Sequence, residues 1–371
     1  MASLRLRGAL GGLLLVLVIA QSSGARRTAL LTQVQAVCRH GGRSPRGTYP
    51  ADPYRNVTWQ GGFGSLLPAG VGDQVRLGAL LRSRYGAALR LQSCQRISVI
   101  SSDRDRTRES ARALLHGLFQ DTELGELEYQ GGPLPPADPI CPIRVIPERD
   151  DFVLRLVSPE RCPRLILAIE AMLKRTPEYR DLVPLLKRVV AEHADIPSAS
   201  SIDLVNVFDI FRTQQLSGLE IPEWAHQSLG SGLPTVYAAL ERFFFLAFGS
   251  QGAPSTRSLS AGGLLRTMVD TARDSDTALR LYAAHDTTLA ALEAALGVYS
   301  GPLPTSSCLL LEVFAAADGA RFVRLLRRSG SSGELRELPL GSRRGPCPLT
   351  KLEELRWLPD SVDDVKRMCR L

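Results

Sequence analysis

Strand-like and helix-like segments alternate in the first third of the chain, and this order limits the folds open to it. Residues 29–37 are rich in Leu and Val and predict a strand, and residues 71–89 carry apolar side chains at helical spacing. Residues 97–100 predict a second strand, and residues 107–119 predict a second helix. Because a parallel sheet is built in this order, we predict an α/β fold, a mostly parallel sheet flanked by helices.

The pattern changes in the middle of the chain. Strand signals become rare between residues 125 and 260, and they return after residue 260. We therefore predict an α/β core made of residues 26–124 and 261–371, with residues 125–260 inserted as a mainly helical lid. The predicted helices of the lid are 164–173, 179–194 and 234–248, and the later core elements are strands 278–283, 308–314 and 322–326 with helix 287–296.

The first 25 residues have the pattern of a secretory signal peptide. Arg5 and Arg7 precede the apolar stretch 9–20, and Ser23 and Ala25 have the spacing that signal peptidase recognises. The apolar stretch is too short to cross a hydrocarbon layer of ~30 Å. We expect cleavage after Ala25, a mature chain without a transmembrane anchor, and a secreted or lysosomal (luminal) location. The sequon at Asn56 predicts a glycosylated surface loop.

Composition narrows the classes of ligand. Apolar residues make up 44% and charged residues 22% of the chain, which excludes a disordered protein. The formal net charge of +7 suits anionic ligands, but it is too small to indicate nucleic acid. The five histidines lie far apart and no CxxC pair occurs, so we expect no metal site and no cofactor.

Seven cysteines in an oxidising compartment predict disulfide bonds. Their odd number leaves at least one thiol unpaired or bonded to another chain. The seven are Cys38, Cys94, Cys141, Cys162, Cys308, Cys347 and Cys369.

Polar residues follow three of the predicted strands directly. Arg39, His40 and Arg43 come after the first strand, Arg106 after the second, and His285 with Asp286 after a later one. Because ligands of open α/β sheets bind at the carboxyl ends of the strands, these side chains should meet in one crevice. Guanidinium groups donate paired hydrogen bonds to phosphate oxygens, so the crevice is predicted to bind a phosphate group.

The residues at these strand ends resemble a known family. The segment Arg39-His40-Gly41-Gly42-Arg43-Ser44-Pro45 matches the RHGxRxP signature of the histidine acid phosphatases, and Ala284-His285-Asp286 matches their distal His-Asp pair. The likeness is to the prostatic, lysosomal and testicular acid phosphatase branch, and it runs from about residue 30 to the C-terminus, thinly between 120 and 260. Further similar stretches are 48–54, 103–107 and 299–304.

The resemblance implies an acid phosphatase that hydrolyses phosphomonoesters. It assigns His40 as the nucleophile that becomes phosphohistidine and Asp286 as the general acid, and the phosphate would be held by Arg39, Arg43, Arg106 and His285. A neutral imidazole performs this chemistry without a metal, and guanidiniums stabilise the transferring group. Because the ordinary pKa of Asp is about 3.9, either burial or acidic conditions must protonate Asp286, which predicts an acidic pH optimum.

The resemblance also implies a disulfide between Cys162 and Cys369. It further implies that a homodimer is one possible assembly of the protein. Cys308 matches half of a second family disulfide, but its expected partner falls near Thr213. Cys347 lacks the upstream partner of the third family disulfide, and Cys94 and Cys141 are additional to the pattern.

Other interpretations stay open at this point. His40 alone would more often be a structural residue, Arg106 a surface charge at a helix start, and Asp286 an N-cap. The main alternative is a catalytically weak or silent relative that binds phosphorylated ligands. A second alternative is a cytosolic mutase of the same superfamily, and the predicted signal peptide argues against it. A cysteine-dependent phosphatase is excluded because only four residues separate Cys38 from Arg43, one too few, so Cys38 is interpreted as a buried strand residue.

Overall fold

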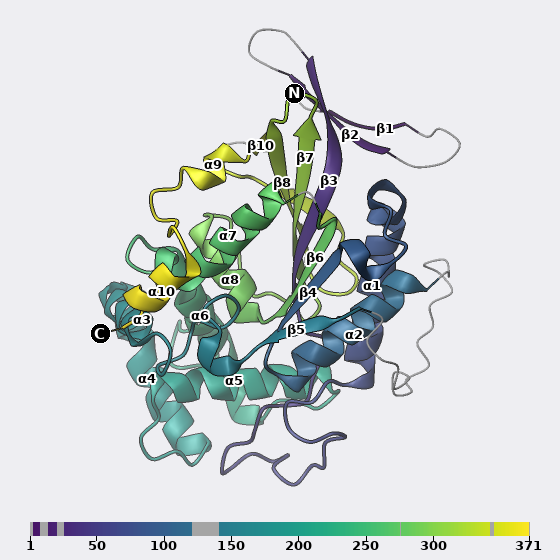
Figure 1. Ribbon diagram of the computed structural model, residues 1–371. Helices are drawn as coiled ribbons and strands as arrows, with labels where there is room; N and C mark the ends of the chain where they lie inside the picture. Colours follow the sequence, from purple (N-terminus) through teal and green to yellow (C-terminus); the bar gives the residue numbers. More distant parts are fainter. Residues whose placement is uncertain are drawn as a thin grey trace.

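A computed structural model describes residues 3–7, 14–20, 26–120, 141–274, 276–341 and 345–370. Its centre is one mixed sheet in the order β10-β8-β7-β3-β6-β4-β5, which β9 extends beside β8 (Figure 1). Strands β3, β6, β4 and β5 run parallel to one another, and β7 to β10 continue the sheet in antiparallel pairs. The α/β architecture with flanking helices is confirmed.

The strands have the following bounds: β1 Ser3–Arg7, β2 Leu14–Ala20, β3 Arg26–Arg39, β4 Ile97–Ser102, β5 Ile143–Ile146, β6 Leu279–Ala284, β7 Cys308–Ala316, β8 Arg321–Arg328, β9 Leu335–Leu338 and β10 Cys347–Pro348. The helices are α1 Pro68–Leu89, α2 Asp105–Phe119, α3 Pro163–Arg175, α4 Pro177–His193, α5 Ser201–Leu216, α6 Val236–Gly249, α7 Arg257–Arg273, α8 Asp286–Ala295, α9 Thr350–Glu353 and α10 Val362–Met368. Among the helices of these described residues, none has both the length and the apolar character of a membrane span.

Two apolar cores form because successive side chains of a strand point to opposite faces of the sheet. Ala36 and Cys38 of β3 pack into a core with α1 and α2, whereas Val37 packs into a second core with α7 and α8. Figure 1 shows these helix pairs on opposite sides of the sheet, with α3 to α6 gathered at one end. The central strands are therefore buried on both faces, and their carboxyl ends remain available for a site.

The segment predicted as a mainly helical insertion contains one element that the sequence pattern did not predict as a strand. β5 pairs in parallel with β4 at the edge of the core sheet, so part of this segment extends the core. β5 has only four residues and lies in a Pro-rich sequence, so its pattern was too short to predict a strand. The part of the predicted insertion before Cys141 lies outside the described residues.

The segment expected to be cleaved supplies β1 and β2. β1 pairs with β2, and β2 pairs with the first residues of β3, Arg26–Leu30. β6 pairs with Val34–Arg39 and β7 with Ala29–Cys38, so β1 and β2 join the sheet at the end of β3 opposite to the strand ends described below.

Candidate active site

Two histidines meet at the carboxyl ends of neighbouring parallel strands. His40 follows β3 directly and His285 follows β6, and these strands pair in register up to Arg39 and Ala284. The two imidazole rings lie 5.6 Å apart between centroids, in an edge-to-face arrangement. Both residues are nearly inaccessible to solvent, with 2% and 4% exposure. The folded chain therefore brings together two motifs that are separated by more than 200 residues in sequence.

The hydrogen bonds of His40 define its tautomer. Its Nδ1 lies 2.9 Å from the carbonyl oxygen of Gly41, which only accepts hydrogen bonds, so Nδ1 carries the proton. Burial, followed by the charges of Arg106 and Arg39, lowers the pKa of His40 well below its ordinary value of 6.5. The neutral ring then has its lone pair on Nε2, which makes this nitrogen a nucleophile.

The loop after His40 packs unusually closely against the start of α1. A Cβ atom on Gly41 would lie 2.3 Å from the carbonyl oxygen of Gly70, and a Cβ atom on Gly70 would lie 2.1 Å from that of Gly42. The backbone of Leu67 also donates a hydrogen bond to Gly42 at 2.9 Å. Only glycine fits at these contacts, so the Gly residues of the motif fix the loop on the helix.

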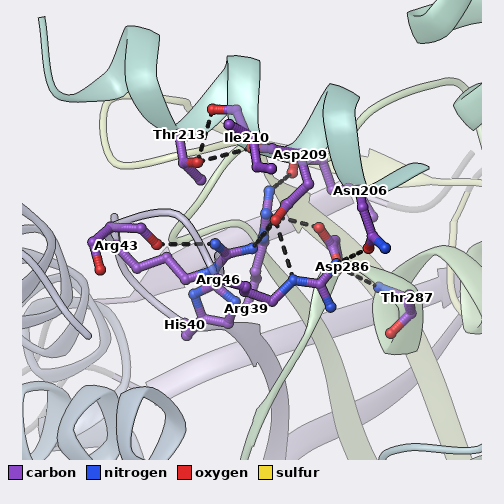
Figure 2. Close-up of polar contacts among 12 residues, drawn as sticks. Arg39, His40, Arg43, Arg46, Asn206, Asp209, Ile210, Thr213, Asp286 and Thr287 are labelled. Atoms are coloured by element: carbon purple, nitrogen blue, oxygen red, sulfur yellow. Dashed lines mark hydrogen bonds and ion pairs between the residues drawn. The ribbon is translucent and has the colours of Figure 1, made fainter. Parts of the chain in front are cut away.

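Arg39 forms an ion pair with Asp286 across the crevice, with 2.7 Å between Nη2 and Oδ2 (Figure 2). Arg39 also donates to the carbonyl of Leu303, and its burial lowers the pKa of the guanidinium to about 10. Burial raises the pKa of Asp286, but Arg39 and Arg212 outweigh that effect and hold the pKa well below the ordinary value of 3.8. Of the two expected sources of a protonated Asp286, burial acts in the expected direction but is outweighed in the ligand-free protein, which leaves acidic conditions.

Asp286 also contacts the helix that it begins. His285 is the N-cap of α8, and Asp286 is its first residue. Its Oδ1 accepts a hydrogen bond from the backbone of Thr287 at 2.8 Å. A carboxylate at a helix N-terminus is stabilised in its charged form, and Oδ2 remains on the side of Arg39. Asp286 is thus beside the cap position rather than the cap itself, and its carboxylate faces the crevice.

A carboxylate from the segment predicted as an insertion holds Arg43 of the first motif and Arg46, which follows that motif. Asp209 of α5 accepts hydrogen bonds from Arg43 at 2.7 and 2.9 Å and from Arg46 at 3.1 Å (Figure 2). Arg46 also donates to Asn206 at 3.1 Å. Burial raises the pKa of Asp209, but Arg43 and Arg46 outweigh it, so the pKa is lowered and the group is ionised. Asp209 was not predicted from the sequence, although a single acidic residue in an otherwise apolar helical turn indicates a functional or paired group.

Hydroxyl groups at the end of β4 fix the ring of His285. Ser102 Oγ lies 2.8 Å from His285 Nε2 and 3.0 Å from Thr107 Oγ1. The Thr107 hydroxyl donates to the carbonyl groups of Ser102 and Arg104, at 2.9 and 2.8 Å. Burial, then Arg106 and Arg155, lowers the pKa of His285 well below 6.5, so this ring is also neutral.

Arg106 is half-buried at the start of α2, and its charge acts on both His40 and His285. Its charge is the largest electrostatic cause of the lowered pKa of each ring, after burial. Its Nε is buried without a hydrogen-bond partner among the described residues. Burial and the charge of Arg43 lower the pKa of Arg106 to about 9. An arginine in this state stabilises an incoming anion strongly, because no carboxylate of the described residues pairs with it.

The remaining predicted sites lie away from the crevice. Asn56 is exposed in a turn, as a glycosylated loop requires. Cys162 bonds to Cys369, as the family resemblance implies, and Cys94 bonds to Cys141. Cys308 bonds to Cys38, its cross-strand neighbour on β3, and not to a residue near Thr213. Cys347 is the free thiol that the odd count requires.

No group of three or more metal-ligating side chains is present in the described part of the chain. The crevice instead contains guanidiniums, two neutral imidazoles and a carboxylate. Groups of these kinds have the charge and the donors that suit a phosphate oxyanion.

Comparison with known proteins agrees with this chemistry. Residues 30–164 match the family model of the histidine phosphatase superfamily (branch 2). Human testicular acid phosphatase is 32% identical over 93% of this chain and 83% of its own length. Rat lysosomal acid phosphatase is 32% identical over 98% and 84%, and bovine prostatic acid phosphatase is 31% identical over 92% and 89%.

Solved structures show the same fold at low sequence identity. The Hafnia alvei phytase in complex with myo-inositol hexakis sulphate has a TM-score of 0.65 at 16% identity, over 92% of this chain and 98% of the phytase. The Citrobacter braakii phytase has a TM-score of 0.63 at 19% identity, over 92% of this chain and 99% of the phytase. The chain belongs to branch 2 of the histidine phosphatase superfamily. Within it, the protein is an enzyme of the histidine acid phosphatase type, which hydrolyses phosphomonoesters.

Proposed function

We propose that the protein hydrolyses phosphomonoesters in two displacements through a phosphohistidine on His40. The observation that carries this proposal is the tautomer of His40, because a hydrogen bond to the Gly41 carbonyl leaves the Nε2 lone pair for attack. Arg39, Arg43 and Arg106 surround this ring and lower its pKa. These groups, with His285, would hold the phosphate oxygens during transfer.

In the first displacement, a bond forms between His40 Nε2 and phosphorus while the bond to the leaving oxygen breaks. Asp286 donates a proton to that oxygen, so the product leaves as an alcohol. In the second displacement, water attacks the phosphorus and the Asp286 carboxylate accepts its proton. The bond to Nε2 breaks, and inorganic phosphate leaves a regenerated neutral imidazole.

The low pKa of Asp286 requires a source for the proton of the first displacement. A phosphate monoester loses its second proton at about pH 6, so under acidic conditions it arrives as a monoanion that carries one proton. Its oxygens attract the donors of Arg39 away from Asp286, and its negative charge raises the pKa of that carboxylate. The proton then passes to Asp286, and this route makes activity highest at acidic pH.

We also propose that the protein enters the secretory pathway, where residues 1–25 are cleaved and Asn56 is glycosylated. Three disulfides among the described cysteines support an oxidising compartment. Relatives of this chain are named lysosomal and prostatic acid phosphatases, which supports either a lysosomal or a secreted destination. Light scattering on the purified protein tests the homodimer that the family resemblance implies.

Rapid quench with a ³²P-labelled phosphomonoester tests the mechanism. The wild-type protein is expected to give an acid-labile, alkali-stable label that is absent from His40→Ala. The control His226→Ala changes an exposed histidine in a short helical turn and should keep the label. Asp286→Ala should still be labelled by 2,4-dinitrophenyl phosphate, whose leaving group needs no proton. A wild-type protein with neither label nor turnover would instead be the silent phosphate-binding relative.

A further inference from the structure

Arg212 is a cation on the Asp286 side of the crevice that the mechanism above does not use. It lies on α5 three residues after Asp209, and side chains at this spacing share one face of a helix. Its charge lowers the pKa of Asp286, second only to Arg39 among the neighbouring charges, and it also acts on Arg39 itself. Arg212 is therefore close to the carboxyl group that would protonate the leaving alcohol.

Aromatic rings, and not a carboxylate, hold the guanidinium of Arg212. Its central carbon lies 5.7 Å from the centroid of the Phe208 ring and 5.8 Å from that of Phe244. By contrast, Arg39 and Arg43 each have an aspartate partner. Within the described ranges, no hydrogen bond or ion pair involves Arg212. The rings fix its position without neutralising its charge, so its N–H groups are free to donate.

A second unused donor lies on the same side. The hydroxyl of Tyr299 is buried and has no hydrogen-bond partner among the described residues. The ring of Tyr299 packs against Phe245 at 5.2 Å. Burial and the charge of Asp286 raise the pKa of the phenol, while Arg212 lowers it, so the three groups share one neighbourhood. A buried hydroxyl without a partner is costly, and a ligand oxygen would relieve that cost.

The balance of charges in this region also favours a second anionic group on the substrate. Around the proposed phosphate position, the cations outnumber the carboxylates by five to two when Arg155 is left out with its partner Glu148, so a bound phosphate group leaves at least one positive charge unmatched. The cations are Arg39, Arg43, Arg46, Arg106 and Arg212, and the carboxylates are Asp209 and Asp286.

We propose that Arg212 and the hydroxyl of Tyr299 bind a second anionic group, carried by the alcohol part of the substrate. The preferred substrates are then phosphomonoesters whose leaving group bears a carboxylate or another phosphate. This inference rests on the proposed function, since the place of the leaving group follows from Asp286 acting as the acid. The two donors would select the substrate and would leave the transfer chemistry to the crevice.

Paired substrates test this assignment. Phenyl phosphate is compared with 3- and 4-carboxyphenyl phosphate, which differ from it by one carboxylate, in the wild type, Arg212→Met, Arg212→Lys and Tyr299→Phe. Met keeps an unbranched side chain against Phe208 and Phe244 and removes the charge. Arg242→Met is the matched control, because Arg242 is an exposed arginine of α6 that pairs with Glu178.

We expect Arg212→Met to lower kcat/KM for a carboxyphenyl phosphate about tenfold or more, as for a lost charged hydrogen bond. Phenyl phosphate should lose less than the carboxyphenyl phosphates, and the ratio of the two kcat/KM values is the readout, because removing the charge of Arg212 also raises the pKa of Asp286 for every substrate. Arg212→Lys should recover part of the preference, Tyr299→Phe should lower it, and Arg242→Met should not change it. Equal losses on the two kinds of substrate, or a wild type without preference, would overturn the inference alone. A wild type that turns over neither would overturn the proposed function and this inference with it.

Discussion

Replacing Asp209 by Asn tests how the inserted segment supports the phosphate-binding arginines. The change removes the negative charge that accepts two hydrogen bonds from Arg43 and one from Arg46. The side chain of Arg43 is only 4% exposed, so water does not replace the lost partner. Leaving one charge of a buried pair uncompensated costs about 3–5 kcal/mol. Because Asn keeps the size and one acceptor oxygen, we expect the lower end, about 3 kcal/mol of unfolding free energy.

Urea denaturation at neutral pH measures the stability, and 4-nitrophenyl phosphate measures kcat/KM. Activity should fall by about 100-fold, because Arg43 is no longer held at the phosphate position. The control Asp270→Asn removes a carboxylate that is 59% exposed and pairs with Arg266 one helical turn away. This surface pair should contribute less than about 0.5 kcal/mol.

A double variant separates charge from packing. Arg43→Met combined with Asp209→Asn removes the uncompensated guanidinium, so it should be more stable than Asp209→Asn alone while remaining inactive. An Asp209→Asn protein as stable as the wild type would refute this reasoning. So would a double variant whose loss of stability equals the sum of the losses of the two single variants.

Three further outcomes are expected. The lowered pKa of His40 keeps the proposed nucleophile unprotonated well below pH 6.5, so kcat/KM should be high in acid. It should fall from pH 5 to 8, because the substrate loses the proton that it would pass to Asp286. A steady rise over that range would contradict the mechanism. Gly41→Ala places a Cβ atom 2.3 Å from the Gly70 oxygen and should lower kcat/KM by more than about tenfold, whereas Gly47→Ala, with open space around it, should not. Burial raises the pKa of Glu293 from 4.5 to about 7, so between these pH values this carboxyl binds a proton in the fold but not in the unfolded chain. Its contribution of about 3 kcal/mol to the unfolding free energy is therefore present at pH 4.5 and lost by pH 8. Because the lowered pKa values of His40 and His285 act in the opposite direction in both proteins, the measurement is the unfolding free energy of the wild type minus that of Glu293→Gln, and a difference that does not fall with pH would exclude this assignment.

The placement of the two histidine motifs was predictable because it depends on local order. Each motif follows a strand with a clear apolar pattern, and parallel strands end at one edge of the sheet. That rule alone predicts that His40 and His285 lie together, and the centroids of their rings are 5.6 Å apart.

Asp209 was not predictable in the same way. Its helix is buried on more than one side, so residues 201–216 lack a strong helical period, and the contact with Arg43 spans 166 residues of sequence. The partner of Cys308 depends likewise on the register between β3 and β7, which no spacing along the chain reveals. The pKa of Asp286 could not be predicted for a different reason, because burial acts against an ion pair whose strength depends on the distance to Arg39.

The bond between Cys38 and Cys308 lies directly behind the residues proposed to be catalytic. Cys38 precedes Arg39 on β3, and the backbone of Arg39 donates to Ser307, the neighbour of Cys308, at 2.8 Å. Reduction would free the two strand ends that carry this loop before it exposed the rest of the sheet. The choice of expression host therefore matters for the enzyme: material from a reducing bacterial cytosol should be compact yet poorly active, and oxidative refolding should restore its turnover.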